Sequence, residues 1–496
     1  MPVKPILLLV TIVSLIACGA ESPTPDTQVL RRGLSAVPAS LDPVLARSVA
    51  SAVVLSDLHE GLLTRDADGK LALGLAESWA WSPDRSHLRF VLRPDLRWSD
   101  GRPLVAGDFV RAWQMLVAPE TGAFYADLLA PVARLEDGLL HIDAVDERHF
   151  NVYLESPVAD FPERLAHPAL SPRAADPLLT SGAYKIASGR SDTTLELVRN
   201  PNYHGADTVA IDVVTYTSFD DEQTEYATYR SGDLDITSRV PRQLFRGDVL
   251  PPDLRRAPYF GVVYLSFNMR EPLPRETRRA LSAAIDRETL ATLVVGRGEQ
   301  PAFSLVPSGM ANGDLTYEPL PTKNDVAAST TMPSEIKINY ATSEENRVVA
   351  LAVQQMWREQ FPTLEVVIEN QEFRVLLAAS REGRFEGLVR NSWIADYDDP
   401  LQFLSLLTTG APSNSAGYSN STFDAVIAAA RVETDAENRA DLLQQAETII
   451  FEDAPVIPLY FFVAKHLVHA RIAGWQDNAL DVHLSRHLTI TPMAGG

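Results

Sequence analysis

The stretch Trp98-Ser-Asp-Gly-Arg-Pro103 is a predicted turn between two segments of different periodicity. Before it, Leu88-Arg-Phe-Val-Leu-Arg93 alternates as a strand does, and after it, Ala106 to Leu116 has the apolar spacing of a helix. Upstream, Ala76-Glu-Ser-Trp79 leads into a second turn signal, Ser82-Pro-Asp84. Aromatic and aliphatic residues at these spacings build a core, and no catalytic chemistry follows from them.

This block also resembles a known family, through E-S-W, S-x-D, F-x-L-R, W-S-D-G-x-P and D-F-x-x-x-W in one order. It is similar to the best-preserved stretch of the bacterial extracellular solute-binding proteins of family 5, the oligopeptide and dipeptide receptors of peptide ABC importers. Ser181-Gly-Ala-Tyr184, Gly232-Asp-Leu-Asp-Ile236 and Gly417-Tyr-Ser419 extend the likeness along nearly the whole mature chain. The resemblance implies a periplasmic-binding-protein-like, bilobal α/β fold with an extra inserted α/β domain.

A second motif, Arg390-Asn-Ser-Trp-Ile-Ala-Asp-Tyr-Asp-Asp-Pro400, follows a strand predicted at 385–389. The aromatic rings of Trp393 and Tyr397 lower the local dielectric, so an ionised Asp396 needs a positive partner. That partner is either a ligand ammonium group or an internal arginine. The motif resembles the family's W-x-A-D-Y-x-x-P segment, where the Asp binds the peptide α-amino group and the residues around the Trp pair with the peptide backbone.

The resemblance implies roles for the residues around Asp396. Ser392 and Ile394 would act through their backbone groups, whereas Trp393 is either core or pocket wall. Arg390 falls where an Arg of the family can meet the far end of a peptide.

The resemblance also implies ligand-binding residues elsewhere in the chain. The segment Arg47, Ser48 and Val49 falls on the second peptide-pairing strand. The cation Arg47 would favour acidic ligand side chains or pair with Asp398 or Asp399. Tyr125, Tyr259 and Tyr264 are large rings that either wall a pocket or pack in the core.

A chain of 496 residues is too long for a single core, and 46% hydrophobic residues is an ordinary globular value. Strands are predicted at 29–34, 211–216, 258–268, 335–340 and 364–369, and helices at 49–58, 106–116, 220–230, 278–286, 346–360, 423–431 and 435–451. On the family's pattern, the expected divisions are a first lobe (29–60, 178–264 and 468–496), an extra domain (61–177) and a further lobe (265–467). Residues 311–333 depart from the family, as a polar loop in place of a helix.

Several classes of function are disfavoured. The net charge of −21 provides no basic surface for nucleic acid. Ser334-Glu-Ile-Lys337 matches the S-x-x-K of acyl enzymes but opens a predicted strand and lacks a K-T-G partner. The pairs His466 with His469 and His483 with His487 lie in stretches predicted to be extended, so isolated histidines are favoured over metal ligands. No enzyme activity, metal site or cofactor is therefore expected.

The single cysteine, Cys18, excludes an intramolecular disulfide. One cation, Lys4, precedes an apolar run from Ile6 to Val13, which is too short to span a membrane and is typical of a secretory signal. Leu15-Ile-Ala-Cys18 resembles a bacterial lipobox. We expect residues 1–17 to be a signal peptide, Cys18 to be lipidated, and residues 18–28 to be a flexible tether.

These observations predict a monomeric, membrane-anchored lipoprotein of the periplasm or cell envelope. It would capture short peptides between its lobes and deliver them to the permease subunits of an ABC importer. The alternatives are the same fold with a nickel chelate, haem, glutathione, an opine or an oligosaccharide, or a peptide-sensing or chaperone role without transport.

Overall fold

A computed structural model describes residues 27–187, 191–246, 249–271, 273–310 and 331–491. The predicted signal, Cys18 and most of 311–333 lie outside these ranges. In the described chain, no helix is both long enough and apolar enough to cross a membrane.

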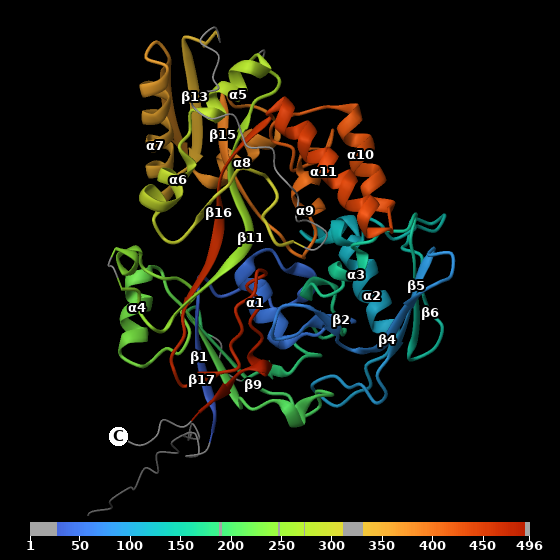
Figure 1. Cartoon of the computed structure of the whole chain (residues 1–496). Coiled ribbons are helices and arrows are strands. Elements are labelled where there is room, and N and C mark those ends of the chain that lie inside the picture. The colour runs from blue at the N-terminus through green and yellow to red at the C-terminus, as the bar shows by residue number, and fades with distance from the viewer. Residues whose placement is uncertain (1–26, 188–190, 247–248, 272, 311–330, 492–496) are drawn as a thin grey trace, which may run out of the picture.

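The chain forms two large bodies connected by two long strands (Figure 1). The upper body has a six-stranded mixed sheet in the order β12-β16-β11-β15-β13-β14. Its strands are β11 (Leu254–Phe267), β12 (Gln300–Pro301), β13 (Glu335–Ala341), β14 (Glu365–Gln371), β15 (Leu388–Ile394) and β16 (Val456–Leu467). Strands β11 and β16 pair from Leu254 with Leu467 to Ser266 with Val456 and run down into the lower body (Figure 1).

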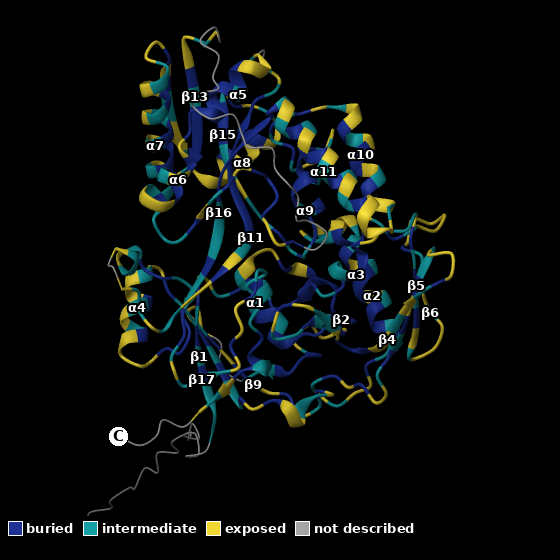
Figure 2. Ribbon diagram, in the orientation of Figure 1, coloured by how far each residue is buried: buried dark blue, intermediate teal, exposed yellow. Residues whose placement is uncertain are grey.

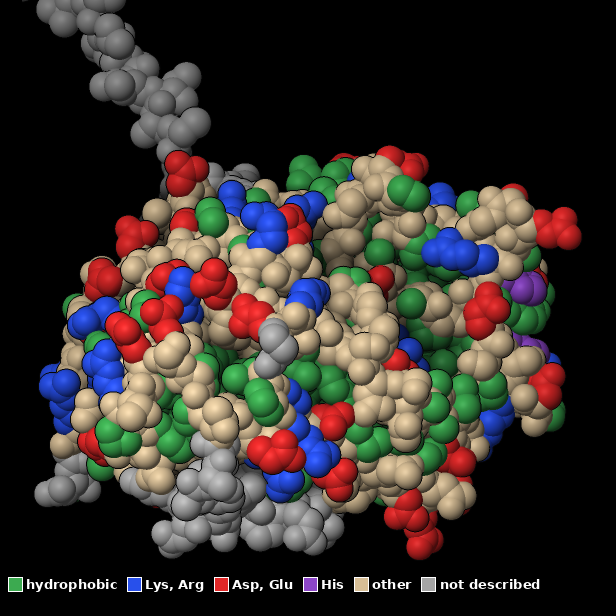
Figure 3. Space-filling view, turned by 90° about the horizontal axis from the view of Figure 1, so that it is seen from above, with side chains coloured by type: hydrophobic (Ala, Val, Ile, Leu, Met, Phe, Trp, Pro, Cys, Tyr) green, Lys and Arg blue, Asp and Glu red, His purple; other side chains and the backbone are tan. Residues whose placement is uncertain are grey.

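Helices cover the upper sheet and form a second core beside it. They are α5 (Arg275–Ala283), α6 (Arg287–Thr289), α7 (Glu344–Gln360), α8 (Phe373–Arg381), α9 (Leu401–Leu404), α10 (Ser421–Val432) and α11 (Ala436–Asp453). Trp357 of α7 is fully buried, and its indole N–H donates to the Leu281 carbonyl over 2.8 Å. The outer faces of α7 and α10 remain in solvent (Figure 2). On the face seen in Figure 3, acidic and basic side chains are interspersed.

The lower body contains two four-stranded sheets, ordered β1-β10-β9-β8 and β4-β5-β7-β6. The first is formed by β1 (Val29–Leu34), β8 (Tyr184–Ile186), β9 (Thr194–Arg199) and β10 (Val213–Ser218), and the second by β4 (Ala76–Trp81), β5 (His87–Leu92), β6 (Ile142–Ala144) and β7 (His149–Tyr153). Short pairs are β2 (Leu63–Arg65) with β3 (Leu71–Leu73) and β17 (Ile472–Ala473) with β18 (Thr489–Ile490). The helices are α1 (Val49–Leu58), α2 (Ala106–Val117), α3 (Phe161–Arg164) and α4 (Glu222–Arg230).

The block around Trp98 forms the elements that its periodicity predicts. Asp108 accepts from the Val105 N–H over 2.9 Å and so caps the start of α2. Trp113 is fully buried on the opposite face and donates to the Leu170 carbonyl over 2.9 Å. The fold is therefore the expected mixed α/β arrangement.

Two predicted strands are misplaced. Strand β15 begins at Leu388 rather than at Phe385, because the chain first turns through Gly387 with φ of +72°. Arg47 to Val49 is not a strand. Val49 starts α1, and the Ser48 hydroxyl caps that helix by accepting from the Ser51 N–H over 3.2 Å.

Gly387 provides a test of how β15 is positioned. A Cβ atom at this residue would lie 2.4 Å from the Lys337 carbonyl oxygen, in addition to the cost of a positive φ. We expect Gly387→Ala to lose more than about 2 kcal/mol of unfolding free energy. Gly410→Ala is the matched control, since Gly410 has φ of +77° and no atom within 4 Å of its Cβ position. Equal urea midpoints for the two variants would contradict the steric argument.

Candidate ligand-binding cleft

A cavity of about 130 Å³ lies where the two bodies meet. At roughly 10–15 Å³ of such volume per water molecule, it has room for several waters or a small ligand. Its walls come from α1 and the 59–65 segment after it, from Tyr125 and residues 166–168, from Tyr259 of β11, from residues 394–396 at the end of β15 and from the loop 480–484. A second, larger cavity of about 340 Å³ lies in the upper body around Phe303 and Glu447, and none of the predicted ligand residues lines it.

Five predicted ligand residues line the smaller cavity: Val49, Tyr125, Tyr259, Ile394 and Asp396. Burial raises the pKa of Asp396 to about 6. The Asp396 carboxylate in turn contributes to the raised pKa of Tyr125 and of Tyr259, for which burial is the larger cause. The carboxylate and both phenols therefore share one confined space.

The Asp396 carboxylate has no cationic partner within the described chain. The Asp396 backbone N–H donates to the Gln402 side-chain oxygen over 3.0 Å. This hydrogen bond fixes the loop after β15. No arginine or lysine among the described residues forms an ion pair with the side chain, so the alternative of an internal arginine partner does not hold there.

The neighbouring acidic and aromatic residues do have internal partners. Asp399 pairs with Arg439 of α11 over 2.8 Å, and both side chains are almost fully buried. Tyr397 packs into the core of the 61–177 region, with the Arg164 guanidinium 5.3 Å from its ring centre. Asp399 is thus paired with Arg439, so of the two predicted partners of Arg47, Asp398 and Asp399, the second does not hold.

The other predicted ligand residues lie outside the cavity wall. Arg47 is exposed and donates to the Gly122 carbonyl over 3.3 Å, and Ser48 caps α1. Arg390 lies 3.8 Å from Glu345 and 3.4 Å from the Tyr460 hydroxyl. Tyr264 is buried in the upper core, so its core alternative is correct.

Ser392 and Trp393 lie on the lower half of β15, which has a free edge. Strand β11 pairs with β15 along its whole length, from Phe267 with Leu388 to Gly261 with Ile394. On the other side, β13 pairs with β15 only at Leu388 and Val389. Ser392 is exposed, whereas Trp393 is half-buried with an indole N–H that lacks a described partner. This edge can accept one further strand.

Sequence reasoning missed two groups of residues in the cavity wall. Arg32, His59, Arg65 and His167 come from the lower body, and the loop 480–484 brings in Asp481 and His483. Burial lowers the pKa of His167 to about 3 and that of His59 to about 4, so both imidazoles are neutral at pH 7. Only the density of histidines near the C-terminus could have pointed to the loop.

The sequence profile of the bacterial extracellular solute-binding proteins, family 5, matches residues 70–415. The chain belongs to this family. Family 5 proteins bind solutes and are not enzymes, which confirms the expectation from the motifs.

Two relatives and one solved structure show how far the family likeness extends. The periplasmic oligopeptide-binding protein OppA of Salmonella typhimurium is 31% identical, with 91% of this chain and 90% of that protein covered. The probable deoxycholate-binding periplasmic protein YgiS of Escherichia coli is 30% identical, with 95% of each chain covered. The structure of Haemophilus influenzae OppA in complex with RPPGFSPFR is 29% identical, with a TM-score of 0.81 over 94% of this chain and 99% of that one. This family 5 protein therefore has the predicted bilobal α/β fold along almost its whole length.

Proposed function

We propose that this family 5 protein captures short peptides in extended form between its two bodies and delivers them to the permease subunits of an ABC importer. The observation that carries the proposal is the Asp396 carboxylate, which lines the cavity and forms no ion pair with an arginine or lysine of the described residues. A peptide α-amino group would supply the missing charge, in a charge-assisted hydrogen bond.

The free edge of β15 supports the same proposal. A peptide added beside Ser392 and Ile394 would form main-chain hydrogen bonds, each contributing about 0.5–1.5 kcal/mol whatever its side chains. Tyr125 and Tyr259 would wall the site, and water would fill the space around variable side chains. The ligand would favour the closed form, which is the form that the transporter would recognise.

Four hydrophobic clusters support the proposed division into lobes. One joins Leu30, Tyr216 and Trp475 from three separate segments, as expected for a lobe of residues 29–60, 178–264 and 468–496. A second lies almost entirely within the extra domain of residues 61–177, and the upper clusters support a lobe of 265–467.

The first experiment is native mass spectrometry of the protein purified without its lipid. We expect copurifying masses that fit di- to pentapeptides and disappear after mild unfolding and refolding. A single discrete non-peptide mass would overturn the peptide assignment and keep the fold.

A non-peptide cargo is the second candidate, because YgiS is named for deoxycholate and is as similar to this chain as the peptide receptors are. An anionic cargo of that kind would place a second negative charge beside Asp396 and offers no cation to it. The unpaired carboxylate therefore favours a peptide amine over a bile acid.

Peptide binding should depend on pH. Asp396 has a pKa of about 6 in the free protein, and an ammonium partner would lower it in the complex. Affinity should therefore be constant near pH 7–8 and fall about tenfold per pH unit well below 6. Burial keeps Tyr125 and Tyr259 neutral in this range, and the imidazoles of His466 and His483 are further titratable groups close to the cavity. Calorimetry with trialanine from pH 4.5 to 8 tests this, and a profile unchanged in Asp396→Asn would assign it to the histidines.

We further propose that Cys18 carries the lipid that holds a periplasmic monomer at the membrane. Cys18→Ser should abolish the lipid-dependent mass increase and move the protein from the membrane to the soluble envelope fraction. Ser14→Ala is the control, since it leaves Leu15 to Cys18 intact. A Cys18→Ser protein that remains in the membrane fraction would refute the anchor.

A further inference from the structure

Three side chains of types that can bind a metal ion lie close together beside the cleft, and one of them comes from a different element than the other two. His466 lies on β16, and Asp481 and His483 lie on the loop that lines the cavity. His466 Nε2 is 2.9 Å and His483 Nε2 is 3.1 Å from the same oxygen, Asp481 Oδ1. Potential ligand atoms of all three residues lie within 4.8 Å of one another. The sequence analysis weighed His466 only with His469 and His483 only with His487, whereas in the structure His466 and His483 both contact Asp481.

Both imidazole rings are held in place by other groups. His466 Nδ1 is 2.7 Å from the Thr237 carbonyl oxygen, which can only accept, so Nδ1 carries the proton and Nε2 faces Asp481. A histidine that ligates a metal usually donates its other N–H in this way. The His483 ring stacks on Trp475, with centroids 3.7 Å apart and an angle of 20°.

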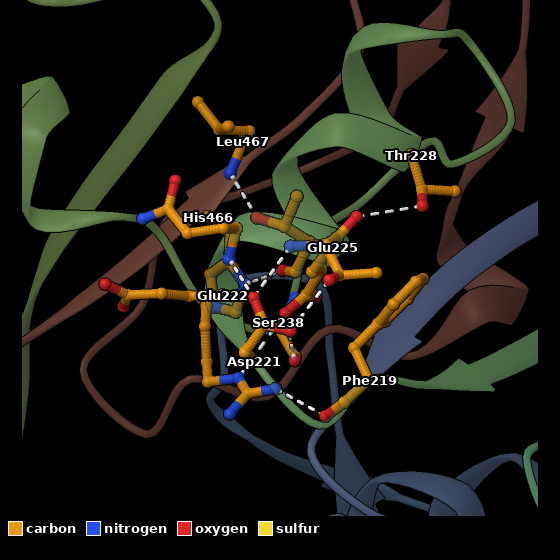
Figure 4. Close-up of polar contacts among 12 residues, drawn as sticks. Phe219, Asp221, Glu222, Glu225, Thr228, Ser238, His466 and Leu467 are labelled. Carbon is orange, nitrogen blue, oxygen red and sulfur yellow. Dashed lines mark hydrogen bonds and ion pairs between the residues drawn. The ribbon is translucent and has the colours of Figure 1, made fainter.

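Hydrogen bonds to the neighbouring Thr237 fix both His466 and the next residue, Leu467. The Leu467 N–H donates to the Thr237 hydroxyl over 2.9 Å. Figure 4 shows His466 and Leu467 on β16 beside Ser238, toward which Glu225 reaches from α4. The carbonyl that orients His466 is therefore held by the neighbouring strand and helix.

This arrangement offers a place for a shared cation. The Nε2 lone pair of a neutral His466 would face a carboxylate oxygen at 2.9 Å, which is repulsive unless a proton or a metal ion lies between them. His483 Nε2 approaches the same oxygen, so one small cation near Asp481 Oδ1 would satisfy all three groups.

We propose that His466, Asp481 and His483 bind a divalent transition metal ion of the Zn²⁺ type. Two imidazoles and one carboxylate form a donor set that suits Zn²⁺ and similar ions better than Mg²⁺ or Ca²⁺. Three protein ligands leave a fourth position open. Because Asp481 and His483 line the cavity, a donor atom of a bound solute can occupy that position.

The nearby guanidinium of Arg32 would repel a metal ion bound by these three side chains. It donates to the His483 carbonyl over 2.8 Å and to the Ser485 hydroxyl over 2.9 Å, which places its positive charge beside the three side chains. Asp57 faces the same region, accepting from the Tyr216 hydroxyl and the Ser485 N–H, and offsets part of this charge. The site is thus expected to be reversible and not a permanent structural centre.

The test uses the untagged mature protein, stripped with a chelator and titrated without peptide, so its outcome is separate from that for peptide capture. Zn²⁺ is titrated by calorimetry, and Co²⁺ by its visible absorption. We expect one equivalent to bind, and the affinity to rise from pH 6 to 7.5 as the metal displaces protons. His483→Gln and Asp481→Asn should each weaken binding at least tenfold.

His149→Gln is the matched control, because His149 also pairs with an aspartate, Asp146, at 2.8 Å. That pair is exposed and lies in a part of the chain distant from His466. Its binding should match that of the parent protein. Anomalous scattering from Zn²⁺-soaked crystals provides a test that needs no variant, and a peak between the three side chains is expected. Absence of binding at millimolar Zn²⁺ and Co²⁺, or unchanged affinity in both site variants, would overturn the proposal.

Discussion

Asp396→Asn should weaken the binding of a short peptide by roughly 2–5 kcal/mol, the range for losing one partner of a buried charge pair. At 1.4 kcal/mol per factor of ten, this corresponds to about 30- to 4,000-fold in Kd. The effect should be large because the carboxylate is confined beside Tyr125 and Tyr259 and has no substitute partner in the described chain. Calorimetry with trialanine at pH 7.5 measures it.

Acetylated trialanine makes this experiment specific to the amine. It lacks the α-ammonium group, so the parent protein should bind it weakly, whereas Asp396→Asn should bind both peptides with similar affinity. Asp207→Asn is the control for the same chemical change at an exposed carboxylate. If the variant loses equal affinity for both peptides, Asp396 supports the cleft without binding the amine.

Local sequence predicts the elements that hold the site. The predicted and observed bounds agree within a few residues for β1 and α2, because caps and periodicity are local signals. The expected strand at Arg47–Val49 is wrong, and the reason for this is also local. A Ser followed by an apolar helical run is a helix start, as the predicted helix at 49–58 already indicated.

Which side chains face the cleft could not be predicted in the same way. Tyr259 and Tyr264 are five residues apart on β11, an odd separation that places them on opposite faces of a regular strand. The register shift between Pro258 and Val262 also changes which face each residue meets. Tyr259 lines the cavity and Tyr264 lies in the core, although the sequence predicts the same two alternatives, pocket wall or core, for both.

Long-range pairs were the least predictable part of the site. His466 meets His483 only because β16 descends beside the C-terminal loop, and Asp399 meets Arg439 across 40 residues. Each partner is ordinary in its local sequence. The acidic cluster after Trp393 thus divides into one carboxylate without a described partner, Asp396, and one that is paired internally, Asp399.

That internal pair leads to the second large prediction. Arg439→Met should lower the unfolding free energy by about 3–5 kcal/mol, because it leaves Asp399 buried without its cation. Burial and the nearby Asp160 carboxylate already raise the pKa of Asp399 to about 6 against the opposing effect of Arg439. Protonation would relieve the unpaired charge, so the deficit should be greatest at pH 8 and smaller at pH 5. Urea unfolding of the peptide-free protein at the two pH values measures both effects.

The double variant Arg439→Met, Asp399→Asn separates charge from packing. It removes both charges and should recover much of the lost stability, whereas a loss due to packing alone would remain. Arg102→Met is the control, since its pair with Asp100 is exposed to solvent and should contribute little to stability. A deficit below about 1 kcal/mol in Arg439→Met would show that the cleft does not depend on this pair. A loss of about 3–5 kcal/mol of unfolding free energy would mean that the Asp399–Arg439 pair holds the loop that carries Asp396.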